Sequence, residues 1–255
     1  MTHNLTRDLF VLFLVVAVPA LSFATARPSR IRAIPRPALY LSAVLSQCLL
    51  AALGVAVVWT TLPGFSMAGF RAVPLRSFYR WTAFLTLASF AAVGIMALLE
   101  RGGWWPEEPE VTRLLLPETR REKVMAVLLV APSAGVCEEF LYRGYLLPQL
   151  SQHFSSWAWG WVASSVAFGL AHSYQGAAGI LQAALLGLLL AYPMVQLRSV
   201  YPSMAAHFVI DALLLAWLGP KLLSGPRQRR QTSAGPDTVR SETTIDCTKR
   251  DGMNS

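Results

Sequence analysis

Charged residues are scarce in this chain, and their scarcity excludes most soluble folds. Asp, Glu, Lys and Arg make up 14% of the 255 residues, whereas 54% are hydrophobic. An ordinary soluble domain carries about 25% charged residues. The sequence instead holds several apolar runs close to the roughly 20 residues that a helix needs to cross a bilayer. We therefore predict an integral, multi-pass membrane protein with a single helical domain.

Cysteines and metal-ligand motifs are also few. Cys48, Cys137 and Cys247 are scattered, without metal-ligand spacing and without the even number of a disulfide framework. The formal net charge is +8, but the basic residues flank apolar runs or lie in the C-terminal tail. This distribution is typical of membrane topology rather than of a nucleic-acid surface. We predict no disulfide, no zinc site and no nucleic-acid partner.

The apolar runs predict an all-α transmembrane bundle of about seven spans, with an eighth left open. The predicted spans cover residues 9–25, 38–60, 81–99, 124–147, 157–172, 176–197 and 202–218. Residues 221–255 have too few apolar side chains to fold alone, which predicts a disordered tail. The chain then divides into N-terminal helices and loops (1–123), a helical core (124–220) and a basic polar tail (221–255).

The ends of the first span bear on processing and orientation. Ala24-Thr25-Ala26 resembles a signal-peptidase site, but the only basic residue before it, Arg7, is offset by Asp8, so we favour an uncleaved span. With seven spans, 16 of the 22 Lys and Arg residues fall on the side of the tail. The positive-inside rule then predicts a cytoplasmic C-terminus.

Two adjacent carboxylates and a guanidinium interrupt the fourth apolar run. Charged groups at membrane depth are costly and usually pair or line a protein interior. On a helix, Glu139 and Arg143 are spaced i,i+4, with the acid on the favourable N-terminal side, and can form an ion pair. Glu138 points elsewhere and has no obvious local partner, which makes it the better candidate for a catalytic carboxylate.

Three further ionisable residues fall in the later spans: His172, His207 and Asp211. His207 and Asp211 share a helix face. If these residues met Glu138, a carboxylate and a histidine could activate a water, and a second histidine held by Asp211 could donate to an oxyanion. Depths counted at 1.5 Å per residue do not put Glu138, His172 and His207 at one level, so a shared site needs kinked or displaced helix ends.

Simpler readings exist for each of these residues. A lone membrane histidine is often bonded to a backbone carbonyl, and Glu139 with Arg143 suits a structural pair. Cys137 lies among small apolar neighbours and suits packing better than a nucleophile, while His3 and His153 have no case for function. The combination is harder to dismiss, because each buried ionisable residue carries its own cost.

The three patterns together resemble a known family. Glu138-Glu139-x-x-x-Arg143, Phe168-x-x-x-His172 and His207-x-x-x-Asp211 are similar, in order and setting, to the motifs of the CPBP family. That family includes the Rce1-type CAAX prenyl endopeptidases and bacterial bacteriocin-processing and self-immunity proteins. The resemblance covers about residues 124–218 and implies an intramembrane endopeptidase that acts on membrane-associated proteins or peptides, some of them prenylated.

The resemblance also implies roles for individual residues. Glu138 with His172 would activate the attacking water, Glu139 and Arg143 would support Glu138, and His207 and Asp211 match the positions that contact the oxyanion. Asp211 stands where the prenyl endopeptidases carry asparagine, and an ionised aspartate cannot donate. A glutamate with two histidines is also a plausible metal set, but no HExxH is present, so we expect no metal and no other cofactor.

Two other functions stay open at this stage. The first is a non-catalytic membrane immunity or scaffold protein with the same fold, and the second is a small transporter with a proton relay. If the protein is bacterial, as its compact size suggests, it belongs in the inner membrane. The sequence does not indicate the substrate, the side on which the site opens or the oligomeric state.

Overall fold

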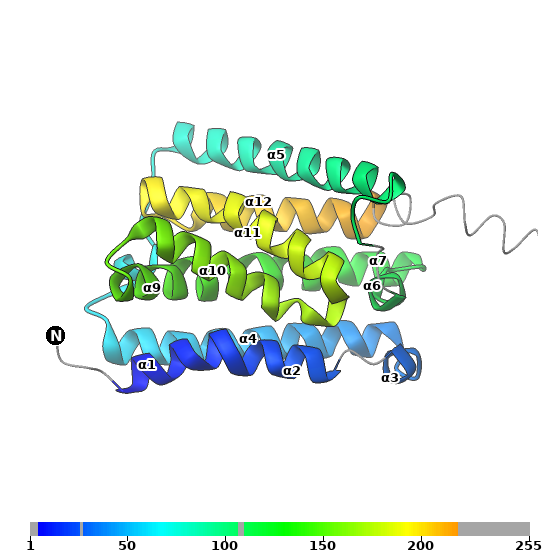
Figure 1. Cartoon of the computed structure of the whole chain (residues 1–255), viewed down its shortest axis with the longest axis horizontal. Helices are drawn as coiled ribbons and strands as arrows, with labels where there is room; N and C mark the ends of the chain where they lie inside the picture. The colour runs from blue at the N-terminus through cyan, green and yellow to red at the C-terminus, as the bar shows by residue number, and fades with distance from the viewer. Residues whose placement is uncertain (1–4, 26–27, 107–109, 219–255) are drawn as a thin grey trace, which may run out of the picture.

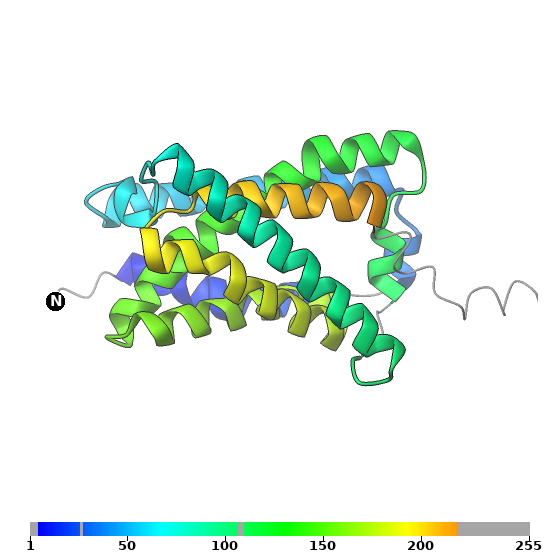
Figure 2. The same cartoon turned by 90° about the horizontal axis from the view of Figure 1, so that it is seen from above.

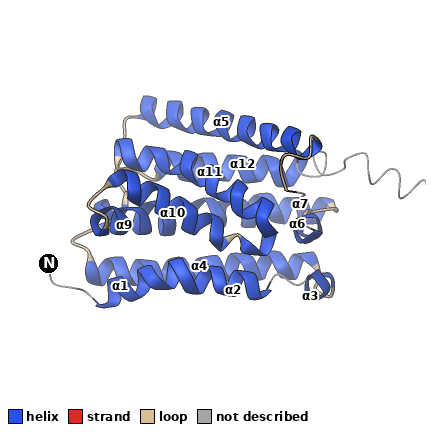
Figure 3. Ribbon diagram, in the orientation of Figure 1, coloured by secondary structure: helices blue, strands red, loops and turns tan. Residues whose placement is uncertain are grey.

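The computed structural model describes residues 5–25, 28–106 and 110–218. All regular secondary structure in these ranges is helical (Figure 3). This confirms the predicted all-α class. The predicted disordered tail, Cys247 and His3 lie outside the described residues.

Each of the seven predicted spans is a helical rod in the described part of the chain. The rods are Leu5–Thr25 (α1, η1 and α2), Arg36–Thr61 (α4), Leu75–Arg101 (α5), Arg120–His153 (α7 to α9), Trp157–Ala171 (α10), Gly176–Leu197 (α11) and Tyr201–Leu218 (α12 and η6). The first four, and α11 together with the short turn before it, are long and apolar enough to cross a membrane. The segment Tyr201–Trp217 is apolar but shorter.

The outer faces of the rods are apolar. On α4, Leu41, Leu45, Leu49 and Leu53 recur every fourth residue and are 48–62% exposed. This spacing forms one continuous stripe along the helix. Soluble monomers rarely expose large contiguous apolar patches, so the stripe faces lipid, and the protein is an integral membrane protein.

Several rods are longer than the apolar runs predict. The fourth rod begins at Arg120 because Thr119 and Glu122 form a capping box, in which each side chain accepts the other's backbone N–H. It continues to His153, beyond the predicted end at residue 147. α5 begins at Leu75, directly after Pro74, rather than at residue 81. Polar residues at helix ends carry no apolar signal, which explains the difference.

The rods lie roughly side by side along the long axis of the molecule (Figure 1). α1, α2 and α4 form one side and α5 the opposite side, with the remaining rods between them. Seen from above, α5 crosses the bundle diagonally over α11 and α12 (Figure 2), and it packs against both. Two short helices, α3 (Pro28–Arg32) and α6 (Glu110–Leu115), pack together at one end.

The rod Arg120–His153 occupies the centre of the packing. Its segment η4 (Ala134–Leu146) contacts α4, α10, α11 and α12. Side chains from η4 and the start of α9, including Phe140, Tyr145 and Leu146, form the middle of the main hydrophobic core with Phe10, Val58 and other residues from neighbouring rods. The carboxylate pair of η4 is therefore held on a segment whose side chains are mostly buried.

The central rod has wide turns on both sides of Pro132, the first of its two prolines. η3 (Ala126–Val130) and η4 are π-helical, and at the end of η4 the Leu147 N–H donates to Tyr142 O, five residues back. Pro132, in the short helix α8 (Ala131–Ser133) between them, has no N–H to donate. Wide turns of this kind recur at functional sites.

Candidate active site

The length of the central rod places Glu138 and His172 at the same depth. The rod ends at His153, fifteen residues after Glu138, and α10 begins at Trp157, fifteen residues before His172. The two helices are antiparallel and joined by a short loop. Because Glu138 and His172 are each fifteen residues from the helix end at this loop, they lie at the same depth. The mismatch expected between Glu138 and His172 arose because the predicted span ended six residues too early, at 147.

Glu138 faces both histidines with one carboxylate oxygen. Its Oε2 lies 4.0 Å from His172 Nε2 and 4.0 Å from His207 Nε2. The Glu138 and His172 side chains are 18% and 17% exposed, so this side of the site is accessible. The sequence placed these three residues on separate spans, and the fold brings them together.

The tautomer of His172 follows from its backbone contact. His172 Nδ1 lies 2.8 Å from Phe168 O, and a carbonyl oxygen only accepts. Nδ1 therefore carries the proton, and Nε2 of the neutral ring is left as an acceptor toward Glu138. The contact with a backbone carbonyl, which alone suits a structural histidine, here aims the second nitrogen into the site.

Glu139 and Arg143 form a buried layer behind the histidines. Arg143 Nη1 lies 3.2 Å from Glu139 Oε1, and the two side chains are 1% and 0% exposed. The same Glu139 oxygen lies 2.8 Å from His207 Nδ1, which donates to it. The ion pair predicted from i,i+4 spacing is present, but it contacts His207 rather than Glu138. Its positioning effect is thus on the second histidine.

Asp211 lies beside His207, as their i,i+4 spacing predicts, and the role suggested for it, orienting that ring, stays a prediction. Glu139 already holds Nδ1 of the ring. Asp211 Oδ2 instead lies 3.5 Å from His207 Nε2, the nitrogen that faces Glu138. Asp211 is 27% exposed, so it lies at the accessible edge of the site. It therefore flanks the open side of His207.

The ring of Phe168 contacts Arg143 and both histidines. The guanidinium of Arg143 stacks over it, 4.0 Å from the ring centroid. The centroid of the Phe168 ring also lies 4.6 Å from that of the His172 ring and 6.2 Å from that of the His207 ring, which it meets edge-on. Phe168 is buried and links α10 to the site through both its ring and its carbonyl. The sequence marked Phe168 only by its spacing from His172.

A glycine on the central rod lets α12 approach closely. A Cβ at Gly135 would lie 3.0 Å from Met204 O and 3.0 Å from Phe208 N, both on the α12 backbone. These two residues bracket His207 in the sequence. The absence of a side chain at Gly135 therefore sets the distance at which His207 reaches the carboxylates.

Two polar residues that no sequence motif marked also reach the site. Gln47, on α4, donates from Nε2 to Glu138 Oε1 at 2.8 Å. Ser133 Oγ lies 2.7 Å from Gln47 Oε1, within reach to donate to it. Gln47 stands alone as an amide in the second apolar span. An isolated polar residue within an apolar span is itself a functional signal, and it would have identified Gln47.

The remaining histidine and cysteines considered in the sequence form no hydrogen bond or ion pair with His172 or His207 in the described part of the chain. His153 ends α9, and the two described cysteines, Cys48 and Cys137, form no disulfide. Among the described residues, no group of three or more His, Cys, Asp or Glu side chains is arranged to hold a metal ion. Glu138, His172 and His207 remain the donors that such an ion would have to use.

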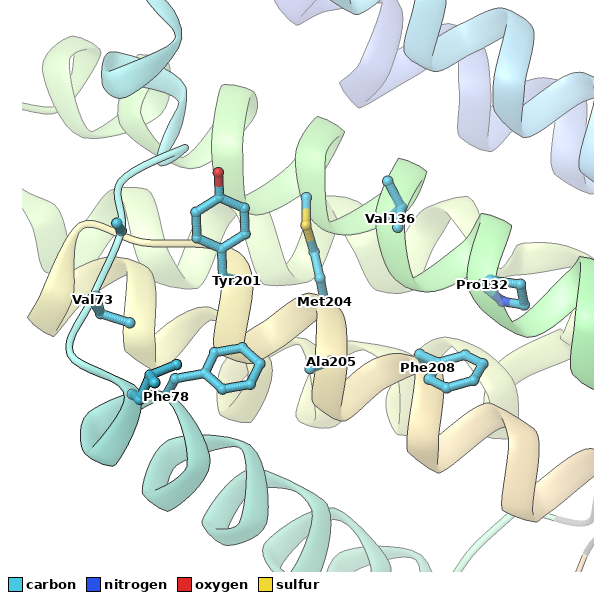
Figure 4. A pocket seen from close by; sticks show the side chains of 10 residues that line it. Val73, Phe78, Pro132, Val136, Tyr201, Met204, Ala205 and Phe208 are labelled. Carbon is cyan, nitrogen blue, oxygen red and sulfur yellow. The ribbon is translucent and has the colours of Figure 1, made fainter.

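An apolar groove of about 520 Å³ lies between the start of α5, the central rod and α12 (Figure 4). Val136 and Phe208 line it, and each lies within two residues of a candidate catalytic side chain. Val73 and Phe78 contribute from the loop before α5 and from α5 itself. None of the candidate catalytic side chains lines the groove.

Comparison with known families gives a match to part of the chain. Residues 120–213 fit the family model described as type II CAAX prenyl endopeptidase Rce1-like. This segment is Rce1-like. The match contains all three motifs, confirms the family recognised from them and supports an intramembrane protease in general. No curated protein and no solved structure matches the chain.

The Rce1-like segment includes every candidate residue first singled out, from Glu138 to Asp211. It begins at the helix start of the central rod and ends in α12. Gln47 lies outside it, on α4. The roles of the individual residues, and the proposed division of the chain at 123 and 220, remain predictions.

Proposed function

We propose that this protein is a glutamate-dependent intramembrane endopeptidase. It hydrolyses peptide bonds in membrane-associated proteins or peptides, prenylated or not. The observation that carries the proposal is the 4.0 Å separation of Glu138 Oε2 from Nε2 of both His172 and His207. These distances are too long for direct hydrogen bonds, but one water at about 2.8 Å from each atom would bridge them.

In the first step, the bound water attacks the peptide carbonyl. One water O–H bond breaks, its proton passes to Glu138 Oε2, and the oxygen forms a bond to the carbonyl carbon. His172 Nε2 accepts a hydrogen bond from the second water proton and keeps the lone pair directed at the substrate. General-base assistance of this kind contributes about 10² to 10⁴ in rate.

In the second step, the tetrahedral intermediate collapses. Glu138 returns its proton to the peptide nitrogen, the C–N bond breaks, and the products are a carboxylic acid and an amine. His207, protonated at Nε2, donates to the oxyanion while Nδ1 stays bonded to Glu139. Asp211 stands beside this donor and fixes the approach of the ring.

The proposal includes independence from metal ions and from other cofactors. Its support is that Glu138 supplies the base and His207 the oxyanion donor, so both charge-handling roles fall to side chains of the chain. We also place the protein in a bacterial inner membrane with its C-terminus in the cytoplasm, because the side of the tail carries most of the Lys and Arg residues.

The test is cleavage by purified protein in reconstituted vesicles. Wild type, Glu138→Ala and His207→Ala are compared on farnesylated and unmodified membrane peptides, with and without a chelator. The proposal predicts wild-type cleavage that survives the chelator and is lost in both variants, each of which still folds and inserts. If the wild type cleaves none of the peptides and the variants still complement a deletion strain, the protein is a non-catalytic membrane partner.

A further inference from the structure

The contact between Gln47 and Glu138 joins the N-terminal helices to the Rce1-like segment at a catalytic atom. Gln47 Nε2 lies 2.8 Å from Glu138 Oε1, while Oε2 of the same carboxylate faces the histidines. The two oxygens of Glu138 thus have different partners. Gln47 is half-buried on α4, in a span whose neighbouring residues are mostly apolar.

The orientation of the Gln47 amide follows from its two neighbours. A carboxylate offers only acceptors, so Gln47 must present its NH₂ group to Glu138. Its carbonyl oxygen then faces Ser133, whose hydroxyl donates across 2.7 Å. Ser133 lies on the central rod, five residues before Glu138. The amide is therefore held at both ends by the same rod that carries the base.

We propose that Gln47, held by Ser133, is a positioning residue that selects Oε2 of Glu138 as the atom that takes the proton. This deepens the endopeptidase function proposed above and rests on it. With Oε1 occupied by an N–H donor, the oxygen left to accept a proton from water is the one 4.0 Å from both imidazoles. Gln47 also fixes the rotation of the carboxylate about its last bond.

If Gln47 positions the base, its loss should affect the turnover number rather than substrate binding. Gln47 contacts the base rather than the substrate, so its loss lowers kcat and leaves KM within about twofold of the wild-type value. A hydrogen bond to a charged group that is lost in this way lowers kcat about 10- to 100-fold. Ser133 also lies 2.9 Å from Val130 O and can donate there instead. Its loss therefore lowers kcat less, about two- to fivefold.

The experiment measures kcat and KM for Gln47→Met, Ser133→Ala and the double variant in reconstituted vesicles. Methionine keeps the length of the side chain and removes the amide. Gln182→Met, the same change at a half-buried glutamine of α11, is the matched control and should stay near wild type. Because Ser133 acts through Gln47, the double variant should be no slower than Gln47→Met.

Two outcomes overturn the inference while the endopeptidase stands. In the first, Gln47→Met keeps wild-type kcat although Glu138→Gln abolishes cleavage. In the second, the losses of Gln47→Met and Ser133→Ala multiply, or KM rises with kcat unchanged, as a merely structural role predicts. Absence of any wild-type cleavage would instead contradict the proposed function.

The contact between Gln47 and Glu138 can also be tested without substrate, even if the wild type cleaves no peptide. Melting temperatures in detergent are compared for wild type, Gln47→Met, Glu138→Met and the double variant. Each single variant already loses the hydrogen bond that the two side chains share, so the double variant loses it only once. Its melting temperature should therefore lie about 2–4 °C above the value obtained by adding the two single shifts. Additive shifts would show that the two side chains do not interact and would overturn the inference.

Discussion

The buried pair of Glu139 and Arg143 gives a stability prediction with a definite order. Arg143→Met leaves Glu139 without its cation, but His207 Nδ1 still donates to it. Glu139→Met removes more, since it strands Arg143 beneath the Phe168 ring and leaves His207 Nδ1 without its acceptor. The glutamate substitution should therefore be the more damaging of the two.

The magnitudes follow from burial. Removing one partner of a buried ion pair costs about 3–5 kcal/mol. We expect about 3 kcal/mol for Arg143→Met, and about 5 kcal/mol for Glu139→Met once the unsatisfied imidazole N–H is included. The double variant removes both charges and leaves only that N–H unpaired, so it should lose about 2 kcal/mol.

The assay is reversible unfolding in mixed detergent micelles, with helical content followed by circular dichroism. At about 2–4 °C per kcal/mol, Glu139→Met should melt about 10–20 °C below wild type. Glu118→Gln is the control, because Glu118 forms an exposed pair with Arg36, and its loss should change stability by less than about 1 kcal/mol. A double variant as unstable as the sum of the singles would refute this reasoning.

Three further predictions concern packing, capping and metal. Gly135→Ala should lower both melting temperature and cleavage, because its Cβ meets the α12 backbone at 3.0 Å, whereas Gly94→Ala, with nothing within 4 Å, should melt no lower than wild type. Thr119→Ala should cost about 1 kcal/mol in unfolding without changing kcat, since it removes only the capping box with Glu122. Dialysis against a chelator should leave the cleavage rate unchanged, and loss of activity restored by one added metal ion would contradict the metal-free mechanism.

The helical class and the family were predictable because their signals are local. Each rod is marked by an apolar run, and the three motifs each lie within one helix, at spacings that a helix converts into a shared face. The pairing of Glu139 with Arg143 follows from the same periodicity. Helix ends were less predictable, since polar end residues such as those from 148 to 153 give no hydropathy signal.

Contacts between rods could not be predicted, because they depend on packing. The hydrogen bond from His207 to Glu139 depends on how closely α12 approaches the central rod at Gly135. Gln47 reaches Glu138 from 91 residues away in the sequence. The sequence distinguishes Gln47 only as a polar residue within an apolar span, and no neighbouring residue indicates that its partner is Glu138.

The role of Glu138 as the base is tested by its isosteric amide. Single-turnover cleavage would be measured for wild type, Glu138→Gln and the exposed control Glu118→Gln in the same vesicles. We expect Glu138→Gln to fold and insert normally but to cleave at least about 100-fold more slowly, with Glu118→Gln unchanged. Cleavage by Glu138→Gln at the wild-type rate would show that Glu138 is not the base.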